Sequence, residues 1–415
     1  SSAKFCSIGG MAGTNAAGAR TLRFGSTRAW IESLDCVFAD GTRGIVRRGN
    51  EVPANVPALG RFLHELQTRM PTTRTVAPFI HEGVRKDSSG YGVAAYAKSG
   101  DLVDLLVGSE GTLAVFVGIE LGLAANPTAV SSVLAEFDSL ESAVNASHKA
   151  AALGASACEL LDRTFLEFAG TYADEPPQAV LLAEIEADSD RAATTSAEML
   201  ATAFRAAGAR EVKIGISPVE QHEIWELRHA ASPILGKLDP RLKSMQIVED
   251  GAVPPKNLAA YVTGLREAFS RQGMRGVIFG HAGDAHVHAN PLIDTLADGW
   301  KARSEALLEE AVSLVARLGG TLSGEHGDGR LRAPFLSFVW SAEAMQLFAD
   351  IKRCFDPDGL LNPGVKFAPA HRGLDPIKYD RALMPLPEVA RAALDSMTAD
   401  RSYDQFRLSL IGQFQ

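Results

Sequence analysis

The chain has 415 residues, of which 46% are hydrophobic and 22% charged, and its formal net charge at pH 7 is −9. This composition is typical of a globular protein, and the length allows two or three domains, each with its own core. The acidic balance, without a basic stripe to bind phosphates, argues against a nucleic-acid-binding surface. Glu120 interrupts the most apolar stretch, 113–125, so we expect no transmembrane segment, and no signal peptide is recognisable.

The cysteines are few and far apart, and they form no CxxC pair. Such spacing favours buried, reduced thiols over disulfides or iron–sulfur ligands. This use of cysteine predicts a cytoplasmic protein. The four residues are Cys6, Cys36, Cys158 and Cys354.

The first part of the chain, to about Pro127, is rich in glycine and in short β-type runs. Residues 34–39 and 43–47 flank the turn Asp40-Gly41 and predict a β-hairpin, because Asp-Gly favours tight turns between antiparallel strands. We also expect a helix over 59–69 and a long buried strand over 113–123. Asn126-Pro127 ends that strand and marks a domain boundary.

From residue 130 to about 293 helical and strand patterns alternate, which is typical of an α+β or α/β domain with helices packed on a sheet. Residues 273–290 predict a strand, a glycine turn and a second strand, and the end of the chain predicts a proline-rich tail. The expected helices are 140–153, 191–207, 255–271, 300–318 and, in the tail, 388–397; the expected strands are 133–137, 179–185 and 276–279.

Two short segments, 280–290 and 323–329, concentrate imidazoles, acids and glycines in a way that a packing core does not require. Two neutral imidazoles and one carboxylate, from His281, His288 and Glu325, form a three-ligand set for zinc or manganese. These ligands leave coordination positions open for a substrate. The segments therefore predict an enzyme with a metal site.

The two other histidines of these segments have separate expected roles. Strand alternation places His286 on the same face as His288, and the turn at 283–284 can return His281 to that point. His326 follows Glu325 directly, so the two side chains point differently, and His326 is left free to move a proton. Polar loop residues satisfied by backbone hydrogen bonds are the plainer interpretation. Three histidines within eight positions argue against it.

Two further segments, 1–18 and 108–112, are rich in glycine and other small residues. Such backbone permits the close approach of a flat or phosphorylated cofactor. Structural turns explain each segment about as well when it is considered alone.

Five blocks together, in this order, resemble a known family: residues 8–18, 104–113, 280–290, 324–327 and 356–364. They are similar to FAD-linked oxidases of the vanillyl-alcohol oxidase superfamily, whose FAD-binding domain is of the PCMH type. The resemblance is to the branch that contains D-lactate, glycolate and D-2-hydroxyglutarate dehydrogenases. It extends over nearly the whole chain, up to Lys366.

The resemblance implies an α+β fold in three parts. Residues 1–127 would form the C-terminal part of a FAD-binding domain whose N-terminal pyrophosphate loop lies outside this sequence. Residues 128–330 would form an α+β substrate (cap) domain, with a mainly antiparallel sheet flanked by helices. Residues 331–415 would form a C-terminal helical segment and tail.

The resemblance also implies roles for individual residues. His281, His288 and Glu325 would bind the metal, and His326 would be the general base. The substrate would contact Asn290, and its carboxylate would pair with Arg228. The residues lining the flavin would be Ser2, Gly9, Gly10, Thr14, Asn15, Gly18, Gly108 and Gly111.

The implied reaction is FAD-dependent oxidation of a D-2-hydroxy acid to the 2-oxo acid, assisted by a divalent metal, zinc or manganese. The electron acceptor would be a quinone, an electron-transfer flavoprotein or a cytochrome. The protein would be cytoplasmic or peripheral to a membrane, and a homodimer is compatible with the family. Two alternatives stay open: a flavin-independent metal hydrolase, and a non-catalytic fragment or subunit whose flavin half is supplied elsewhere.

The sequence departs from the family pattern at one loop. The family reads Gly-Asp-Gly-Asn before the second histidine ligand, whereas residues 283–286 read Gly-Asp-Ala-His. His286 is therefore a candidate to replace His281 as a ligand or to touch the substrate. In addition, no cysteine-rich iron–sulfur domain follows, unlike in the long members of the group.

Overall fold

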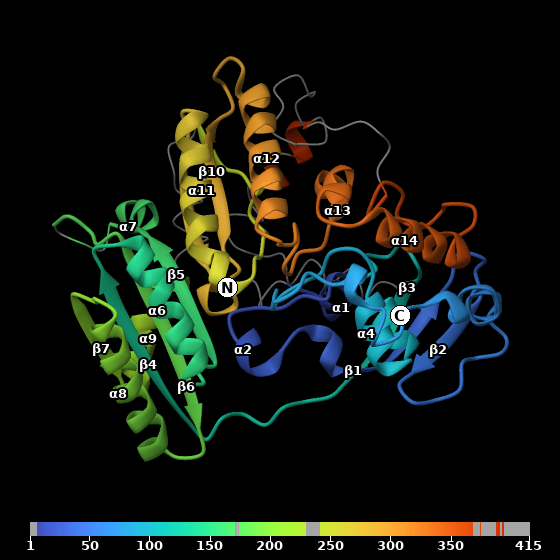
Figure 1. Ribbon diagram of the computed structural model, residues 1–415, viewed down its shortest axis with the longest axis horizontal. Helices are drawn as coiled ribbons and strands as arrows, with labels where there is room; N and C mark the ends of the chain where they lie inside the picture. Colours follow the sequence, from blue (N-terminus) through green and yellow to red (C-terminus); the bar gives the residue numbers. More distant parts are fainter. Residues whose placement is uncertain are drawn as a thin grey trace.

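The computed structural model describes residues 6–170, 172, 174–229, 241–367, 374, 387–390 and 392–393. The chain forms two lobes side by side, one built on a small sheet and one on a large sheet (Figure 1). The long helices α11 (Leu258–Arg271) and α12 (Trp300–Arg317) belong to the large lobe and lie toward the small one.

The small lobe contains a three-stranded antiparallel sheet in the order β2-β1-β3. The expected hairpin is confirmed, since β1 (Ile31–Val37) pairs with β2 (Arg43–Arg47). The expectation of a buried strand over 113–123 is wrong in its burial. Strand β3 (Val115–Leu121) lies at the sheet edge with one face uncovered, so Val115 and Val117 are 49% and 54% exposed.

Short helices cover the other face of this sheet. The predicted helix over 59–69 is confirmed, although it changes from an α to a π and then to a 3-10 helix along its length. The elements of this lobe are α1 (Ile8–Thr14), α2 (Thr21–Phe24), η2 (Thr27–Trp30), α3 (Pro57–Arg61), η3 (Phe62–Leu66), η4 (Gln67–Arg69), η5 (Ala77–Phe79), α4 (Val93–Ser99) and α5 (Leu102–Leu106).

The chain returns to the small lobe after completing the large one. Helix α14 (Ala342–Phe355) buries Ile351 and Phe355 in the same hydrophobic core as Leu34 of β1. Segments far apart in the sequence therefore share one core. The connecting elements are α13 (Gly329–Arg332) and η8 (Ala333–Phe338).

The large lobe is a seven-stranded sheet in the order β7-β4-β6-β5-β9-β10-β8, with antiparallel pairing between all neighbours. The predicted mainly antiparallel sheet is confirmed. Its strands are β4 (Ala129–Phe137), β5 (Ala157–Asp162), β6 (Ala179–Ala187), β7 (Glu211–Gly215), β8 (Leu242–Ser244), β9 (Arg275–Gly280) and β10 (His288–Asp294).

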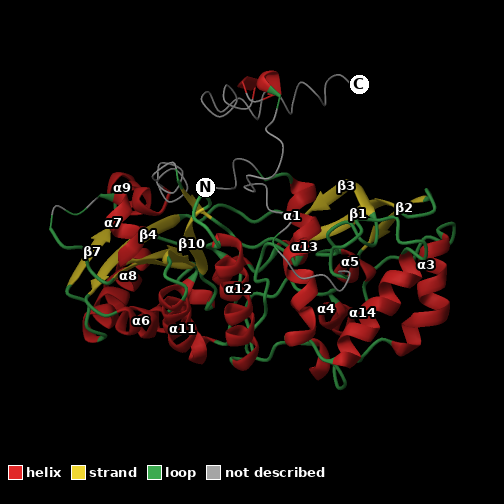
Figure 2. Ribbon diagram, turned by 90° about the horizontal axis from the view of Figure 1, so that it is seen from above, coloured by secondary structure: helices red, strands yellow, loops and turns green. Residues whose placement is uncertain are grey.

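Helices cover both faces of this sheet, as Figure 2 shows. Strand β6 illustrates the alternation: Leu181 and Ala183 point into the main core, whereas Val180 and Leu182 point into a smaller core on the opposite face. The main core lies under α6 (Leu140–Ala152), α8 (Asp190–Ala206), α11 and α12; the smaller one lies under α7 (Arg163–Ala169) and α9 (Pro218–His229).

The helices expected over 140–153, 191–207, 255–271 and 300–318 correspond to α6, α8, α11 and α12. The helix expected over 388–397 lies largely outside the described residues. Within the described ranges, no helix combines the length and hydrophobicity needed to cross a membrane.

Candidate metal centre and adjoining cavity

The turn between β9 and β10 carries the three clustered histidines. Gly280 ends β9 with φ +124°, and a Cβ at this position would lie 2.8 Å from His288 Cδ2, so glycine allows the two strands to approach here. The 3-10 turn η7 (Ala282–Asp284) follows, and the His286 N–H then donates to the His281 carbonyl. The turn returns the chain on itself, as predicted.

The three imidazoles converge on Glu325, which comes from the loop after α12. His281 Nε2 lies 3.1 Å and His288 Nε2 3.4 Å from Glu325 Oε1, and His286 Nδ1 lies 3.9 Å from Glu325 Oε2. One donor atom from each of the four side chains lies within 4.8 Å of the others, and all four side chains are buried. The structure thus brings both predicted segments to one point.

This donor set fits a divalent cation. Imidazole nitrogen and carboxylate oxygen suit zinc, manganese and iron, and His286 Nδ1 is buried without a hydrogen-bond partner among the described residues. Burial raises the pKa of Glu325, but His281 and Lys86 more than offset this, so its pKa lies well below the usual value. Burial lowers the pKa of His288 and brings that of His286 to about 4, which favours the neutral rings that metal ligands require. Burial also lowers the pKa of His281, but Glu159 and Glu325 raise it above its usual value.

Lys86 is a member of the site that the sequence interpretation missed. Its side chain is almost fully buried, and its ammonium donates to Glu325 Oε2 at 3.0 Å and to the Gly18 carbonyl at 2.8 Å. Asp284 Oδ2 lies 3.7 Å away. Lys86 comes from the small lobe, and it therefore ties that lobe to the histidine cluster.

His326, the expected base, lies beside the cluster and is 39% exposed. Its Nδ1 donates to Glu249 Oε1 at 3.0 Å, and Asp250 Oδ1 lies 3.5 Å away. Burial lowers the pKa of His326, but Asp250 and Glu249 raise it to about 9. Without a cation at the cluster, the ring is thus protonated at neutral pH, and a base requires the neutral form.

Arg228 is connected to the cluster indirectly, through Glu159. Its Nε donates to Glu159 Oε2 at 2.6 Å, and Glu159 Oε1 accepts from His281 Nδ1 at 2.5 Å. Glu159 is fully buried in β5. The predicted carboxylate-binding arginine and a predicted metal ligand therefore share one buried acid.

Asn290 lies two residues after His288 on β10, so both side chains point to the same face of the sheet. It is 3% exposed, and its Oδ1 has no hydrogen-bond partner among the described residues. Buried polar atoms usually have partners, so this oxygen is suited to meeting a ligand.

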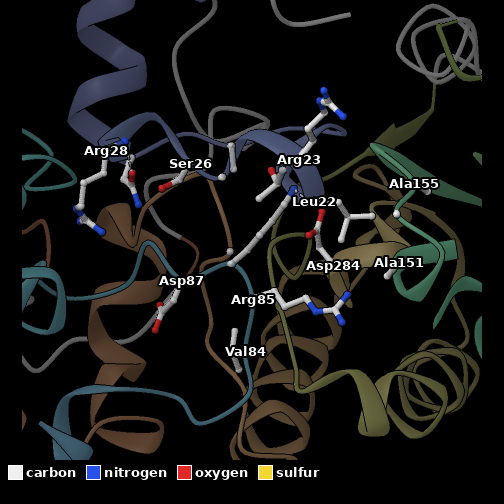
Figure 3. A pocket seen from close by; sticks show the side chains of 17 residues that line it. Leu22, Arg23, Ser26, Arg28, Val84, Arg85, Asp87, Ala151, Ala155 and Asp284 are labelled. Carbon is white, nitrogen blue, oxygen red and sulfur yellow. Dashed lines mark hydrogen bonds and ion pairs between the residues drawn. The ribbon is translucent and has the colours of Figure 1, made fainter. Parts of the chain in front are cut away.

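A cavity of about 730 Å³ opens beside the cluster, between the two lobes, and it falls within the size range of small-molecule sites (Figure 3). Its lining carries more cations than anions: Arg23, Arg28, Arg85 and Lys86 line it together with Asp87 and Asp284. Two of its buried polar atoms, Arg28 Nε and Asp284 Oδ2, have no hydrogen-bond partner among the described residues. A polar, anionic ligand the size of a flavin nucleotide fits these properties.

Of the residues predicted to line a flavin, one lines this cavity. Asn15 lines it directly, and Gly18 lines an adjoining pocket. Gly108 packs against Asn15, since a Cβ there would lie 3.2 Å from Asn15 Cβ. Gly9, Gly10 and Thr14 lie in α1, and Gly111 is in a turn with φ +70°. Ser2 lies outside the described residues.

Three residues that contact the cluster were not predicted from the sequence, for a common reason. Lys86 and Glu159 are isolated in ordinary polar or strand-like stretches, and Lys86, Glu159 and Asp250 each reach the cluster from a different segment. Of the three, only Asp250 had a local signal, because it follows another acid, Glu249, and precedes Gly251.

Comparison with protein families matches residues 126–365 to the family described as FAD linked oxidases, C-terminal domain. The chain is 30% identical to the glycolate oxidase subunit GlcD of Escherichia coli K12 over 300 residues, which is 70% of this chain and 59% of that protein. It is 29% identical to the D-lactate dehydrogenase of Archaeoglobus fulgidus over 369 residues, 87% of this chain and 70% of that protein.

Among solved structures, the fold resembles that of 4-ethylphenol oxidase from Gulosibacter chungangensis. The TM-score is 0.60 at 12% sequence identity, and the match covers 88% of this chain and 70% of that one. The chain thus spans between about 60% and 70% of the length of these proteins.

Proposed function

This chain belongs to the FAD-linked oxidases, and from that premise we propose that it takes part in the oxidation of a D-2-hydroxy acid to the corresponding 2-oxo acid. Similar chains named as glycolate oxidase and D-lactate dehydrogenase support this substrate class. Glycolate, D-lactate and D-2-hydroxyglutarate are the acids to test. The electron acceptor would be a quinone, an electron-transfer flavoprotein or a cytochrome.

One observation carries the proposal. The buried cluster of His281, His286, His288 and Glu325 adjoins a cavity of about 730 Å³ that four cationic side chains line. Arg228 is linked to this cluster through Glu159, and Asn290 lies two residues after His288 on β10. A 2-hydroxy acid has one hydroxyl and one carboxylate to hold. A cation site beside an arginine matches that pair of groups.

Bound FAD supplies the two-electron acceptor, and a bound divalent ion such as zinc or manganese supplies a Lewis acid for the substrate hydroxyl. Asn15, Gly18 and the basic side chains of the cavity would hold the flavin, and His281, His288 and Glu325 would hold the ion. Each group thus has residues of fitting chemistry in this chain.

The protein residues then orient the substrate and move the proton. Arg228 is held through its Nε by Glu159, and its terminal nitrogens would pair with the substrate carboxylate. Fixing the carboxylate selects the face of C2 that is presented for oxidation. Asn290 Oδ1 would accept a hydrogen bond from the bound acid.

His326 would take the proton of the substrate hydroxyl. The pKa near 9 set by Asp250 and Glu249 opposes this role in the metal-free protein. A divalent cation held by Glu325 would lower that pKa by charge repulsion, so the neutral His326 ring would be available to take the proton.

The test uses the purified full chain with added FAD and manganese or zinc. Flavin absorbance that is bleached anaerobically by a D-2-hydroxy acid, but not by its L-enantiomer, is the expected result. His326→Ala should abolish bleaching while metal content is retained, and His148→Ala, on α6, should behave as wild type. Bleaching at an unchanged rate in His326→Ala would contradict its assignment as the base.

The same preparation separates the alternatives that the sequence left open. Bound metal with hydrolytic activity and no flavin would favour the hydrolase. Neither flavin nor metal binding would favour a fragment or subunit whose flavin half is supplied elsewhere.

A further inference from the structure

We propose that His286 is a fourth protein ligand, through Nδ1, so that the cluster holds its ion with three imidazoles and one carboxylate. This inference rests on the proposed metal requirement of the function and goes beyond it. The three-ligand set of His281, His288 and Glu325 is extended by a residue at which this chain departs from its family pattern.

The first argument is the orientation of the His286 ring. Its Nε2 lies 3.0 Å from Asp250 Oδ1, and the same carboxylate also accepts from the Ser323 hydroxyl and from the His326 backbone N–H. A carboxylate with these donors around it acts as an acceptor, so Nε2 carries the imidazole proton. Nδ1 is therefore the nitrogen with a free lone pair.

That lone pair accepts no hydrogen bond from the described residues. His286 is fully buried, and Nδ1 has no hydrogen-bond partner among the described residues. Glu325 Oε2 lies 3.9 Å away, which is too far for a hydrogen bond. A buried, unsatisfied acceptor costs roughly 1–3 kcal/mol, and a bound cation removes that cost.

The second argument is that His281 and His288 are held in the same manner. His281 donates from Nδ1 to Glu159, and His288 donates from Nδ1 to the Glu249 carbonyl. Each ring then turns its other nitrogen toward Glu325. Metal-binding histidines commonly have such an outer acceptor, which fixes the tautomer and the ring orientation. In His286 the outer acceptor, Asp250, meets Nε2, so Nδ1 is the nitrogen that faces Glu325.

The third argument is distance. Two atoms bonded to one ion at about 2.1 Å can be at most about 4.2 Å apart. Glu325 Oε1 lies 3.1 Å from His281 Nε2 and 3.4 Å from His288 Nε2, and Glu325 Oε2 lies 3.9 Å from His286 Nδ1, so each histidine–carboxylate pair is below that limit. One donor atom from each of the four side chains lies within 4.8 Å of the others.

The residue before Glu325 provides the space for the ring. A Cβ on Gly324 would lie 2.7 Å from His286 Cδ2, so only glycine lets this backbone pass so close to the imidazole. The backbone and the ring that would both surround the ion are therefore packed directly on each other.

Four protein ligands have a consequence for the choice of ion. A tetrahedral zinc ion would have no position left, whereas a six-coordinate ion such as manganese keeps two. Two positions are the number that the hydroxyl and one carboxylate oxygen of a 2-hydroxy acid need. The proposal thus favours manganese or iron(II) over zinc.

The experiment counts imidazoles. The full chain is stripped with a chelator and reloaded with manganese alone, and X-ray absorption at the manganese edge is compared for wild type, His286→Gln and His148→Gln. Glutamine can keep the donor toward Asp250 but removes the inward nitrogen. His148, on α6, is a matched control because its Nδ1 also lacks a partner among the described residues.

The expected result is three imidazoles in wild type and in His148→Gln, and two in His286→Gln. We also expect manganese to bind His286→Gln at least ~10-fold more weakly, because even outer-shell partners of ligands contribute 10–100-fold. A purely structural role of His286 could weaken binding, but it would not change the number of imidazoles.

Two imidazoles in wild type would overturn the proposal, and that measurement needs no variant to fold. A wild-type protein that binds no divalent metal would overturn both this inference and the metal role in the proposed function. Three imidazoles in a protein that oxidises no 2-hydroxy acid would support the ligand assignment and contradict only the proposed reaction.

Discussion

Glu159 is the most informative single position to change, because one buried carboxylate serves both Arg228 and His281. In Glu159→Gln the side chain keeps its shape and loses its charge. The amide oxygen can accept from only one of the two donors, and the amide NH₂ then faces the other. Arg228 or His281 is therefore left with an unfavourable contact in a buried place.

The magnitude follows from burial. Glu159 is 0% exposed and the Arg228 side chain 14% exposed, and breaking such a pair by removing one partner costs about 3–5 kcal/mol. Loss of the outer acceptor of a metal-binding histidine lowers metal affinity about 10–100-fold. We therefore expect a large loss of stability without metal and weaker metal binding.

A matched control exists on the surface. Glu167 also bridges two cations, Arg163 and Arg275, but it is 38% exposed. Glu167→Gln should cost no more than about 1 kcal/mol, because solvent screens exposed ion pairs.

The assay is urea unfolding of the metal-free proteins, followed by manganese titration of each. Equal losses of unfolding free energy in the Glu159 and Glu167 variants would refute the reasoning, since burial would then have no influence on the outcome. Unchanged manganese affinity in Glu159→Gln would show that Glu159 does not orient His281.

Three further changes test other parts of the site. Lys86→Met removes the cation that occupies Glu325 Oε2, so manganese affinity should rise in a direct titration, whereas the metal-free protein should lose stability. Burial raises the pKa of Asp162 to about 7, above its value in the unfolded chain, so folding favours the protonated carboxyl. The free energy of unfolding is therefore higher at low pH and falls as the pH rises toward 7. Asp162→Asn should therefore be more stable than wild type at pH 8, by about 1.4 kcal/mol for each unit of the pKa shift, and equal stabilities in thermal melts at pH 8 would contradict this. Gly324→Ala forces a methyl against the His286 ring and should cost about 1–3 kcal/mol of unfolding free energy, together with metal affinity; wild-type values for both would show that the ring has room to move.

Local patterns predicted much of the fold. The Asp40-Gly41 turn predicted the β1–β2 hairpin, and the periodicity of four segments predicted α6, α8, α11 and α12. These predictions succeed because turn chemistry and helical periodicity depend on neighbours in the sequence. The burial of β3 was predicted wrongly, because whether a sheet face is covered depends on distant segments.

Strand β5 shows the same limit within the site. Its sequence, Ala-Cys-Glu-Leu-Leu-Asp, places an acid in the middle of an otherwise apolar run, so no strand was predicted there. Glu159 is tolerated at that position only because Arg228 and His281 meet it in the folded protein. Partners that lie 69 and 122 residues away leave no local signal.

The sequence by itself indicated the four side chains that converge at the centre of the site: the crowding of histidines at 281–288 and the acid at 325 predicted a metal site. Only the tertiary structure decided which ring nitrogen of each histidine faces Glu325. The outward nitrogens of His281, His286 and His288 are held by Glu159, Asp250 and the Glu249 carbonyl, respectively. Because a neutral imidazole has one proton, an acceptor from a distant segment sets the tautomer, and with it the number of lone pairs directed at Glu325.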